Sequence, residues 1–145
     1  MYEHHCSITV RYAETDQMGV VYHANYLIYF EVARVQALKA LGLRYADLEA
    51  QGLGLPVAHV SINYLKPALY DQTLTLITQI KGLGRNINKV DRQCQTRHQA
   101  GNLLNQAEVV LVLVDLKTKK NTVFPEDISE KILYHIAEKT QIIEK

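Results

Sequence analysis

The sequence predicts an α+β domain in which a curved antiparallel sheet wraps around one long apolar helix. Three observations support this: an apolar segment of helical length near the N-terminus, a series of β-type segments after it, and a second helical pattern at the end. A helix that is apolar nearly all round must be covered, and a curved antiparallel sheet covers most of it. Its open side still needs cover, so we expect a homo-oligomer, with edge strands pairing between subunits.

Composition is typical of a single globular domain. The 145 residues are 48% hydrophobic and 21% charged, so we expect one domain over residues 1–145. A net charge of +1 argues against a general nucleic-acid binder, which carries a clear basic excess. The two cysteines, Cys6 and Cys94, form no CxxC pattern and fit a reducing compartment. With no signal-peptide pattern and no apolar run of ~18 residues, the sequence predicts a cytoplasmic protein without a transmembrane segment.

The first expected element is a half-buried strand over residues 6–12. Apolar and polar side chains alternate there, and the alternation puts Tyr12 on the same face as Ile8 and Val10. Tyr12 is therefore a candidate core aromatic. A polar segment over residues 13–19 follows and is expected to be a loop.

The long helix is expected from Tyr26 to Leu41. Asn25 suits its N-cap, and Gly42 suits the position just after its end. The few polar residues do not gather into one wide face, which is typical of a buried helix. At 1.5 Å per residue, roughly 16 residues span about 24 Å, the width of a small domain.

The pattern after Pro56 is that of β-strands. Strands are expected at Val57–Leu65, Thr73–Lys81, Asn86–His98 and Asn105–Leu116, with a short one at Asn121–Phe124. The continuously apolar segment Val109–Val114 needs cover on both faces, so it belongs near the middle of a sheet. A last helix is expected from Pro125 to Ile143, with the proline near its start.

Reactive side chains gather between the first strand and the long helix. They are Tyr12, Glu14, Thr15, Asp16, His23, Asn25 and Glu31. At a helix start, unpaired backbone N–H groups and the helix dipole favour negative charge. Asp16 could attack an acyl carbon or activate water while those N–H groups stabilise an oxyanion. A polar loop that only caps a helix has a similar composition, so the residues alone leave both interpretations open.

Three segments together resemble a known family. They are YAETDQMGVVYHANY from Tyr12 with the later Phe30, Glu31 and Arg34; NYLKPA from Asn63 with Asp71; and LVD from Leu113 with Thr118 and Pro125. The first resembles the signature of the hotdog-fold acyl-CoA thioesterases, and within them the YbgC/FadM-like branch of the 4-hydroxybenzoyl-CoA thioesterase superfamily. The other two resemble that family's second strand and turn and its last strand. The resemblance covers most of the chain.

The resemblance implies a hotdog fold, a homotetramer built as a dimer of dimers, and hydrolysis of an acyl-CoA or acyl carrier protein thioester without a metal or redox cofactor. It makes Asp16 the catalytic carboxylate, places Tyr12 and His23 near the reacting centre, and makes the His23 backbone N–H the oxyanion donor. Relatives that hydrolyse the 4-hydroxybenzoyl ester have a polar residue before the proline equivalent to Pro56. Leu55 stands there in this chain, which favours an aliphatic acyl group.

Other charged residues have two interpretations. Glu31 and Arg34 are three apart on the long helix and are expected to form an ion pair, although Glu31 is the next candidate carboxylate if Asp16 proves dispensable. Arg85 and Lys89, near a glycine-containing turn, are candidates for binding the CoA phosphates. The same turn could simply be solvated. The histidines show no metal-ligand spacing.

Two other functions remain open from the sequence. One is a hotdog hydratase or dehydratase, because a shared fold does not fix the reaction. No histidine-containing segment of that group is recognisable here. The other is a non-catalytic acyl-CoA binding or interaction module, against which the presence of both Asp16 and His23 argues.

Overall fold

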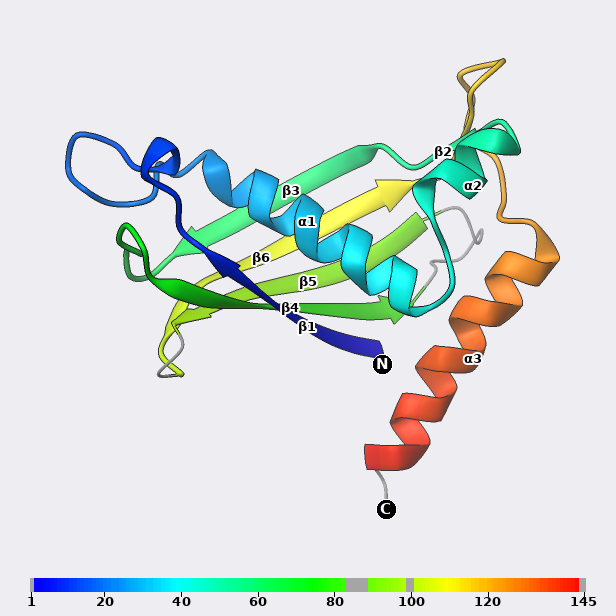
Figure 1. Cartoon of the computed structure of the whole chain (residues 1–145). Coiled ribbons are helices and arrows are strands. Elements are labelled where there is room, and N and C mark those ends of the chain that lie inside the picture. The colour runs from blue at the N-terminus through cyan, green and yellow to red at the C-terminus, as the bar shows by residue number, and fades with distance from the viewer. Residues whose placement is uncertain (1, 83–88, 99–100, 144–145) are drawn as a thin grey trace.

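A computed structural model describes residues 2–82, 89–98 and 101–143 of the chain, shown in Figure 1. Its main sheet has the strand order β1-β4-β5-β6-β3, and every neighbouring pair is antiparallel. The strands are β1 (Tyr2–Thr9), β3 (Val57–Tyr64), β4 (Thr73–Gly82), β5 (Lys89–His98) and β6 (Leu103–Val112). The predicted α+β class and antiparallel sheet are therefore confirmed, and β1 and β3 are the two edges.

The first strand ends earlier than predicted. It covers Tyr2–Thr9, and the chain then enters a short 3₁₀ turn, η1 (Tyr12–Glu14). The alternation continues through Val10, which is buried, but Tyr12 lies past the strand and its side chain is 79% exposed. The interpretation of Tyr12 as a core aromatic is therefore wrong, because a period-two pattern does not show where a strand leaves its sheet.

The last strand is also shorter than predicted. The segment expected at Asn105–Leu116 divides into β6 and a two-residue strand, β7 (Val114–Asp115), which pairs with β2 (Leu53–Gly54). The predicted strand at Asn121–Phe124 is wrong, since only an isolated bridge between Val114 and Asn121 forms there. The prediction that Val109–Val114 is covered on both faces is confirmed for Val109, Val110 and Leu111, which are all buried on β6, between β5 and β3. Val112 and Val114 are only partly buried.

The helix α1 (Asn25–Ala40) packs against β1 and β4 and lies across the sheet in Figure 1. Its buried residues are Tyr26, Tyr29, Phe30, Ala33, Ala37 and Leu38. They meet a sheet face that includes the fully buried Leu74, Leu76 and Ile80. The exposed residues Leu27, Ile28 and Val32 lie on the same helix, so one chain leaves part of α1 uncovered.

Both ends of α1 have clear local causes. Gly42 has a φ of 83°, the left-handed conformation that ends a helix without strain on a side chain. The predicted N-cap is one residue off: Ala24 occupies that position, and Asn25 is the first helical residue. The Asn25 side chain instead donates a 2.8 Å hydrogen bond to the carbonyl oxygen of Glu14, which joins the helix to the preceding loop.

Two further helices complete the fold. They are α2 (Tyr45–Ala50) and α3 (Glu126–Ile143), and α3 begins directly after Pro125, as predicted. Ile128 and Ile132 bury one face of α3, which packs against β1 and β4. None of the helices in the described ranges is long and apolar enough to cross a membrane.

Candidate active site at the start of helix α1

The loop between β1 and α1 folds back on itself like a small hairpin. Thr15 and Val21 form an antiparallel bridge, and the Asp16 amide donates to the carbonyl of Val20 at 2.9 Å. Gly19 allows the tight turn because its φ is 79°, a conformation that residues with a Cβ rarely adopt. The hairpin therefore places the segment that carries Asp16 beside the segment that leads into the helix.

The same loop is attached to the connection between β3 and β4. The amide of Val21 donates to the carbonyl of Ala68 at 2.8 Å, and Val20 forms a bridge with Leu69. In Figure 1 this connection and the loop lie at the end of the sheet where α1 begins. Backbone contacts with this connection therefore fix the loop's position.

Asp16 is held by one of its two carboxylate oxygens. Oδ1 accepts the Met18 amide at 2.9 Å, an arrangement that short acidic side chains favour in turns. Within the described ranges, Oδ2 accepts no hydrogen bond from the protein. The side chain is only partly buried, so one oxygen fixes its direction while the other can meet a substrate or a water molecule.

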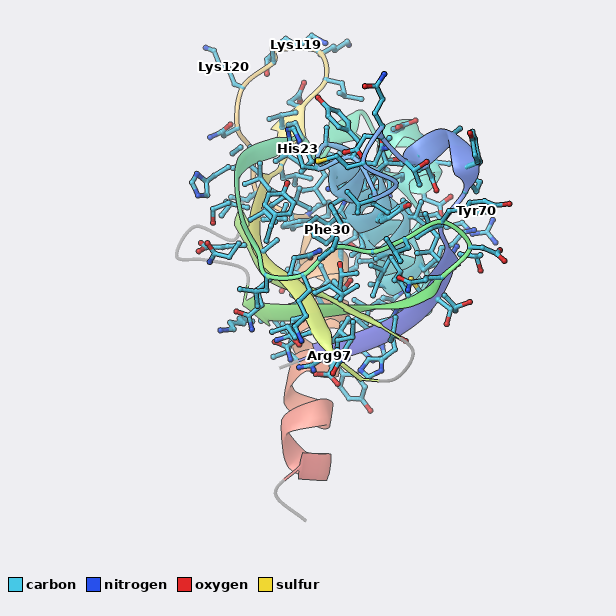
Figure 2. All side chains as sticks on the ribbon, turned by 90° about the vertical axis from the view of Figure 1, so that its left-hand side faces the viewer. His23, Phe30, Tyr70, Arg97, Lys119 and Lys120 are labelled. Atoms are coloured by element: carbon cyan, nitrogen blue, oxygen red, sulfur yellow. The ribbon has the colours of Figure 1, made fainter. Side chains whose placement is uncertain are left out.

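His23 lies two residues before the first residue of α1, with an exposed side chain that Figure 2 labels. Its ring packs on Tyr22, with centroids 4.5 Å apart, and lies edge-on to Tyr64 at 6.3 Å. The Tyr64 hydroxyl donates to the His23 carbonyl at 3.0 Å, so β3 fixes the backbone here. Tyr64 is an anchor that sequence reasoning placed in a motif without giving it a role.

The helix start has unpaired amides, as the sequence predicts. Neither the His23 nor the Ala24 amide donates to any acceptor in the described part of the chain. Both residues are exposed, so these N–H groups are accessible to a ligand. Free N–H groups at the positive end of a helix dipole suit an oxyanion.

Tyr12 lies on the outer side of the loop. Its ring packs edge-to-face on Tyr70, with centroids 5.7 Å apart, and Tyr70 is also exposed in Figure 2. The Tyr12 carbonyl accepts hydrogen bonds from the amide and the hydroxyl of Thr15, at 3.2 and 2.8 Å, but no described contact joins the Tyr12 ring to Asp16 or His23. A catalytic role for Tyr12 stays a prediction.

A buried carboxylate, Glu14, lies under the loop and was given no role from the sequence. Its Oε1 accepts the Arg11 amide at 2.8 Å and the Tyr29 hydroxyl at 2.9 Å, and its Oε2 accepts the Arg11 guanidinium at 2.9 Å. Burial alone would raise the pKa of Glu14, but the hydrogen bonds from Arg11 and Tyr29 outweigh it and leave this pKa below its usual value. Burial and the neighbouring carboxylate raise the pKa of Tyr29 well above its usual range. The one sequence signal for this cluster is the spacing of three between Arg11 and Glu14.

A hollow of about 230 Å³ lies between α1 and the edge strand β3. Its walls are mostly apolar and comprise Leu27, Phe30, Glu31, Arg34, Val57, Val60 and Val109. The predicted ion pair between Glu31 and Arg34 is wrong: no salt bridge joins them, and the guanidinium of Arg34 lies 5.9 Å over the ring of Tyr45. Two charged groups therefore face this hollow without neutralising each other.

Leu55 does not line the hollow. It is 8% exposed and belongs to the hydrophobic core, while Pro56 beside it is exposed and accepts the Val112 amide through its carbonyl. Of the two predicted phosphate-binding residues, Arg85 and the side chain of Lys89 lie outside the described residues. The described side chains contain no group of three or more potential metal ligands.

Comparisons with known proteins agree with this architecture. The family model "Thioesterase-like superfamily" matches residues 10–132. "Acyl-CoA thioester hydrolase YbgC" from Escherichia coli O6:H1 is 33% identical over 83% of this chain and 89% of its own length. "Putative acyl-CoA thioesterase YneP" from Bacillus subtilis is 51% identical over 51% of this chain, and the match spans about half, 54%, of that relative.

A solved structure extends the similarity to the whole chain. It is a DHNA-CoA thioesterase from Staphylococcus aureus, 30% identical, with a TM-score of 0.82 over 99% of this chain and 94% of the other. The antiparallel sheet with a helix packed on it is the architecture of the hotdog fold, which the solved thioesterase shares. The chain belongs to the thioesterase-like superfamily and to its YbgC-like branch. This membership makes it an enzyme of the hydrolase class.

Proposed function

We propose that this protein hydrolyses acyl-CoA thioesters to a free acid and CoA, with Asp16 as nucleophile or general base. The observation that carries the proposal is the pair of accessible amides, of His23 and Ala24, at the end of the loop that holds Asp16. A carboxylate beside such donors is what acyl transfer needs, because negative charge develops on the carbonyl oxygen as the nucleophile adds to the carbonyl carbon, before the bond to sulfur breaks. The family relationship supports the same reaction.

Each group has a distinct task in this scheme. The free amides hold the thioester oxygen. Oδ2 of Asp16 either takes a proton from the attacking water, or attacks the carbonyl carbon and expels the CoA thiolate, leaving an acyl anhydride that water then hydrolyses. The imidazole of His23 assists the leaving thiolate or orients water, and Tyr12 helps to position the substrate. Arg85 and Lys89 bind the CoA phosphates. None of these tasks calls for a metal or redox cofactor, and an acyl carrier protein thioester is an alternative form of the substrate.

The acyl group would lie along α1, in the hollow beside β3. From Leu27 to Arg34 the helix rises about 10 Å at 1.5 Å per residue, which is room for a medium-length chain or a ring system. The apolar walls favour an aliphatic acyl group. The similarity to a DHNA-CoA thioesterase favours a second candidate, a hydroxylated aromatic acyl group.

The assembly is part of the proposal. Residues 1–145 act as one cytoplasmic hotdog domain, and a second copy pairs along the edge strand β3 to give a dimer or a dimer of dimers. Exposed apolar residues on both elements support this pairing: Leu27 on α1, and Val57 and Val60 on β3. In such a dimer α1 becomes the central helix, wrapped by sheet.

The decisive experiment is thiol release from a panel of acyl-CoAs, short to long and aliphatic to aromatic. We expect Asp16→Asn to lower kcat/KM by about 10²–10⁴-fold, the usual contribution of a general base. Asp47→Asn, which changes an exposed carboxylate on α2, is the matched control and should keep full activity. A loss of less than ~10-fold in Asp16→Asn would contradict the assignment and make Glu31 the next carboxylate to test. Hydration of an enoyl-CoA, or tight binding without turnover, would favour one of the other two functions.

A further inference from the structure

Glu14 is the only charged residue buried among the described side chains, and the proposed reaction leaves it without a task. Burying a carboxylate is unfavourable unless its oxygens are fully hydrogen-bonded. The Glu14 side chain meets that condition, because Arg11 and Tyr29 together supply four donors to it. Such a buried, fully bonded charge indicates a position that is fixed in space.

The side chain connects the strand end to the inside of the helix. Arg11, just past β1, donates through its amide and through its guanidinium at 3.2 and 2.9 Å. Tyr29, one turn into α1, is fully buried and donates its hydroxyl to the same carboxylate at 2.9 Å. The carboxylate thus joins the end of β1 to the first turns of α1, which the loop separates in the sequence.

The backbone of Glu14 holds the returning half of the loop. Its carbonyl accepts the Tyr22 amide at 2.9 Å and the Asn25 side-chain amide at 2.8 Å. Tyr22 directly precedes His23, and Asp16 is only two residues after Glu14. Glu14 therefore fixes three parts of the molecule relative to one another: the segment that carries Asp16, the start of α1 and the body of α1.

We propose that Glu14, acting through Tyr29, is a positioning residue that holds Asp16 in register with the amides at the start of α1. The proposal rests on the proposed function, because the register matters only if both groups meet one substrate. Neither Glu14 nor Tyr29 touches the substrate. Since a misplacement of about 1 Å can lower a rate by 10²-fold, loosening this contact lowers kcat more than it weakens binding.

Tyr29→Phe tests the proposal, because it removes one oxygen atom and leaves the ring in the core. Tyr2→Phe is the matched control: the Tyr2 hydroxyl is also buried and donates to α1, at the Ala37 carbonyl, 3.0 Å away. Both variants lose one buried hydrogen bond, so their melting temperatures should fall by similar amounts. We expect Tyr29→Phe to lower kcat about 10-fold or more with KM within about threefold, and Tyr2→Phe to lower kcat less than twofold.

A double-mutant cycle tests whether the two residues act as one unit. Glu14→Gln keeps the shape of the side chain but turns one acceptor into a donor, and it should lower kcat at least as much as Tyr29→Phe. The double variant should be no worse than Glu14→Gln alone, because the two changes break the same contact. Additive losses would overturn the proposal. If Glu14→Gln fails to fold, the comparison of Tyr29→Phe with Tyr2→Phe still decides.

Amide hydrogen exchange separates this proposal from the proposed function, because it needs no substrate. Residues 15–23 should exchange faster in Tyr29→Phe than in Tyr2→Phe or the wild type. Equal exchange in the two variants, or equal losses of kcat, would overturn the positioning role. A third outcome is that Tyr29→Phe exchanges faster but Asp16→Asn keeps its activity. Glu14 would then hold the loop as proposed, and the role given to Asp16 in the reaction would be wrong.

Discussion

The substitution Val57→Asp tests the proposed assembly at the edge strand. Val57 begins β3, lines the hollow beside α1 and is 47% exposed in the single chain. If a second copy covers β3, this side chain becomes buried in the dimer. A two-fold interface contains each contact twice, so a single substitution removes two buried side chains and adds two carboxylates to the interface.

The expected effect follows from the exposed area. Full burial of a valine side chain stabilises by about 1.5–3 kcal/mol, and roughly half of that area remains to be buried. The loss is therefore about 0.7–1.4 kcal/mol per copy, or about 1.4–2.8 kcal/mol per dimer. Since 1.4 kcal/mol corresponds to a tenfold change, the dissociation constant should rise by at least ~10-fold, before the cost of burying a carboxylate is added.

Sedimentation across a concentration series measures this change. Val123→Asp is the matched control, because it makes the same substitution at a side chain that is 60% exposed but lies in the connection before α3. The reasoning predicts weaker association for Val57→Asp and unchanged association for Val123→Asp. If both variants self-associate as strongly as the wild type does, at unchanged thermal stability, the assignment of β3 as the interface is refuted.

Two further outcomes are expected for stability. Because the folded pKa of Glu14 lies below its usual value, its ionised form contributes stability above the unfolded pKa of about 4.3 and loses it as the pH falls through the folded pKa. Urea unfolding between pH 6 and 3 should therefore show a flatter acid dependence for Glu14→Gln, and parallel curves would contradict this. Gly42→Ala should lower the unfolding free energy by about 1 kcal/mol or more, since its φ is 83° and a Cβ would meet Lys131 at 3.3 Å. Gly82→Ala, which has neither problem, should leave stability unchanged or slightly higher.

The elements were predictable where a local pattern determines them. The period-two segments around Val57 and Thr73 gave strands within one residue of those observed. Gly42 gave the end of α1 because a left-handed φ is a local property of glycine. Strand ends were less predictable: β1 stops at Thr9 although the alternation continues, since leaving the sheet depends on the partner β4 beginning at Thr73.

The residue types of the candidate site were predictable from the sequence, but the contacts that hold them in place were not. The segment with Asp16 and His23 could be recognised because it combines reactive groups with a helix start. The contacts of Glu14 with Tyr29 and of Tyr64 with His23 span 15 and 41 residues, and no sequence period joins such positions. The expected Glu31–Arg34 pair failed for the related reason that Arg34 finds Tyr45, a residue from another helix.

The exposure of the candidate site connects the assembly to the reaction. Tyr12 and His23 are exposed and Asp16 is only partly buried, whereas oxyanion stabilisation is strongest where water is excluded. The loop is already fixed by Glu14, so closing it further would break bonds that are fully formed. Water must then be excluded from the candidate site by a group outside the loop, which is either the substrate or a second copy placed against β3 and α1. If the second copy supplies it, Val57→Asp should lower activity per chain as the protein is diluted, and Val123→Asp should not. Activity independent of concentration in both variants would mean that the acyl-CoA itself excludes water from the site.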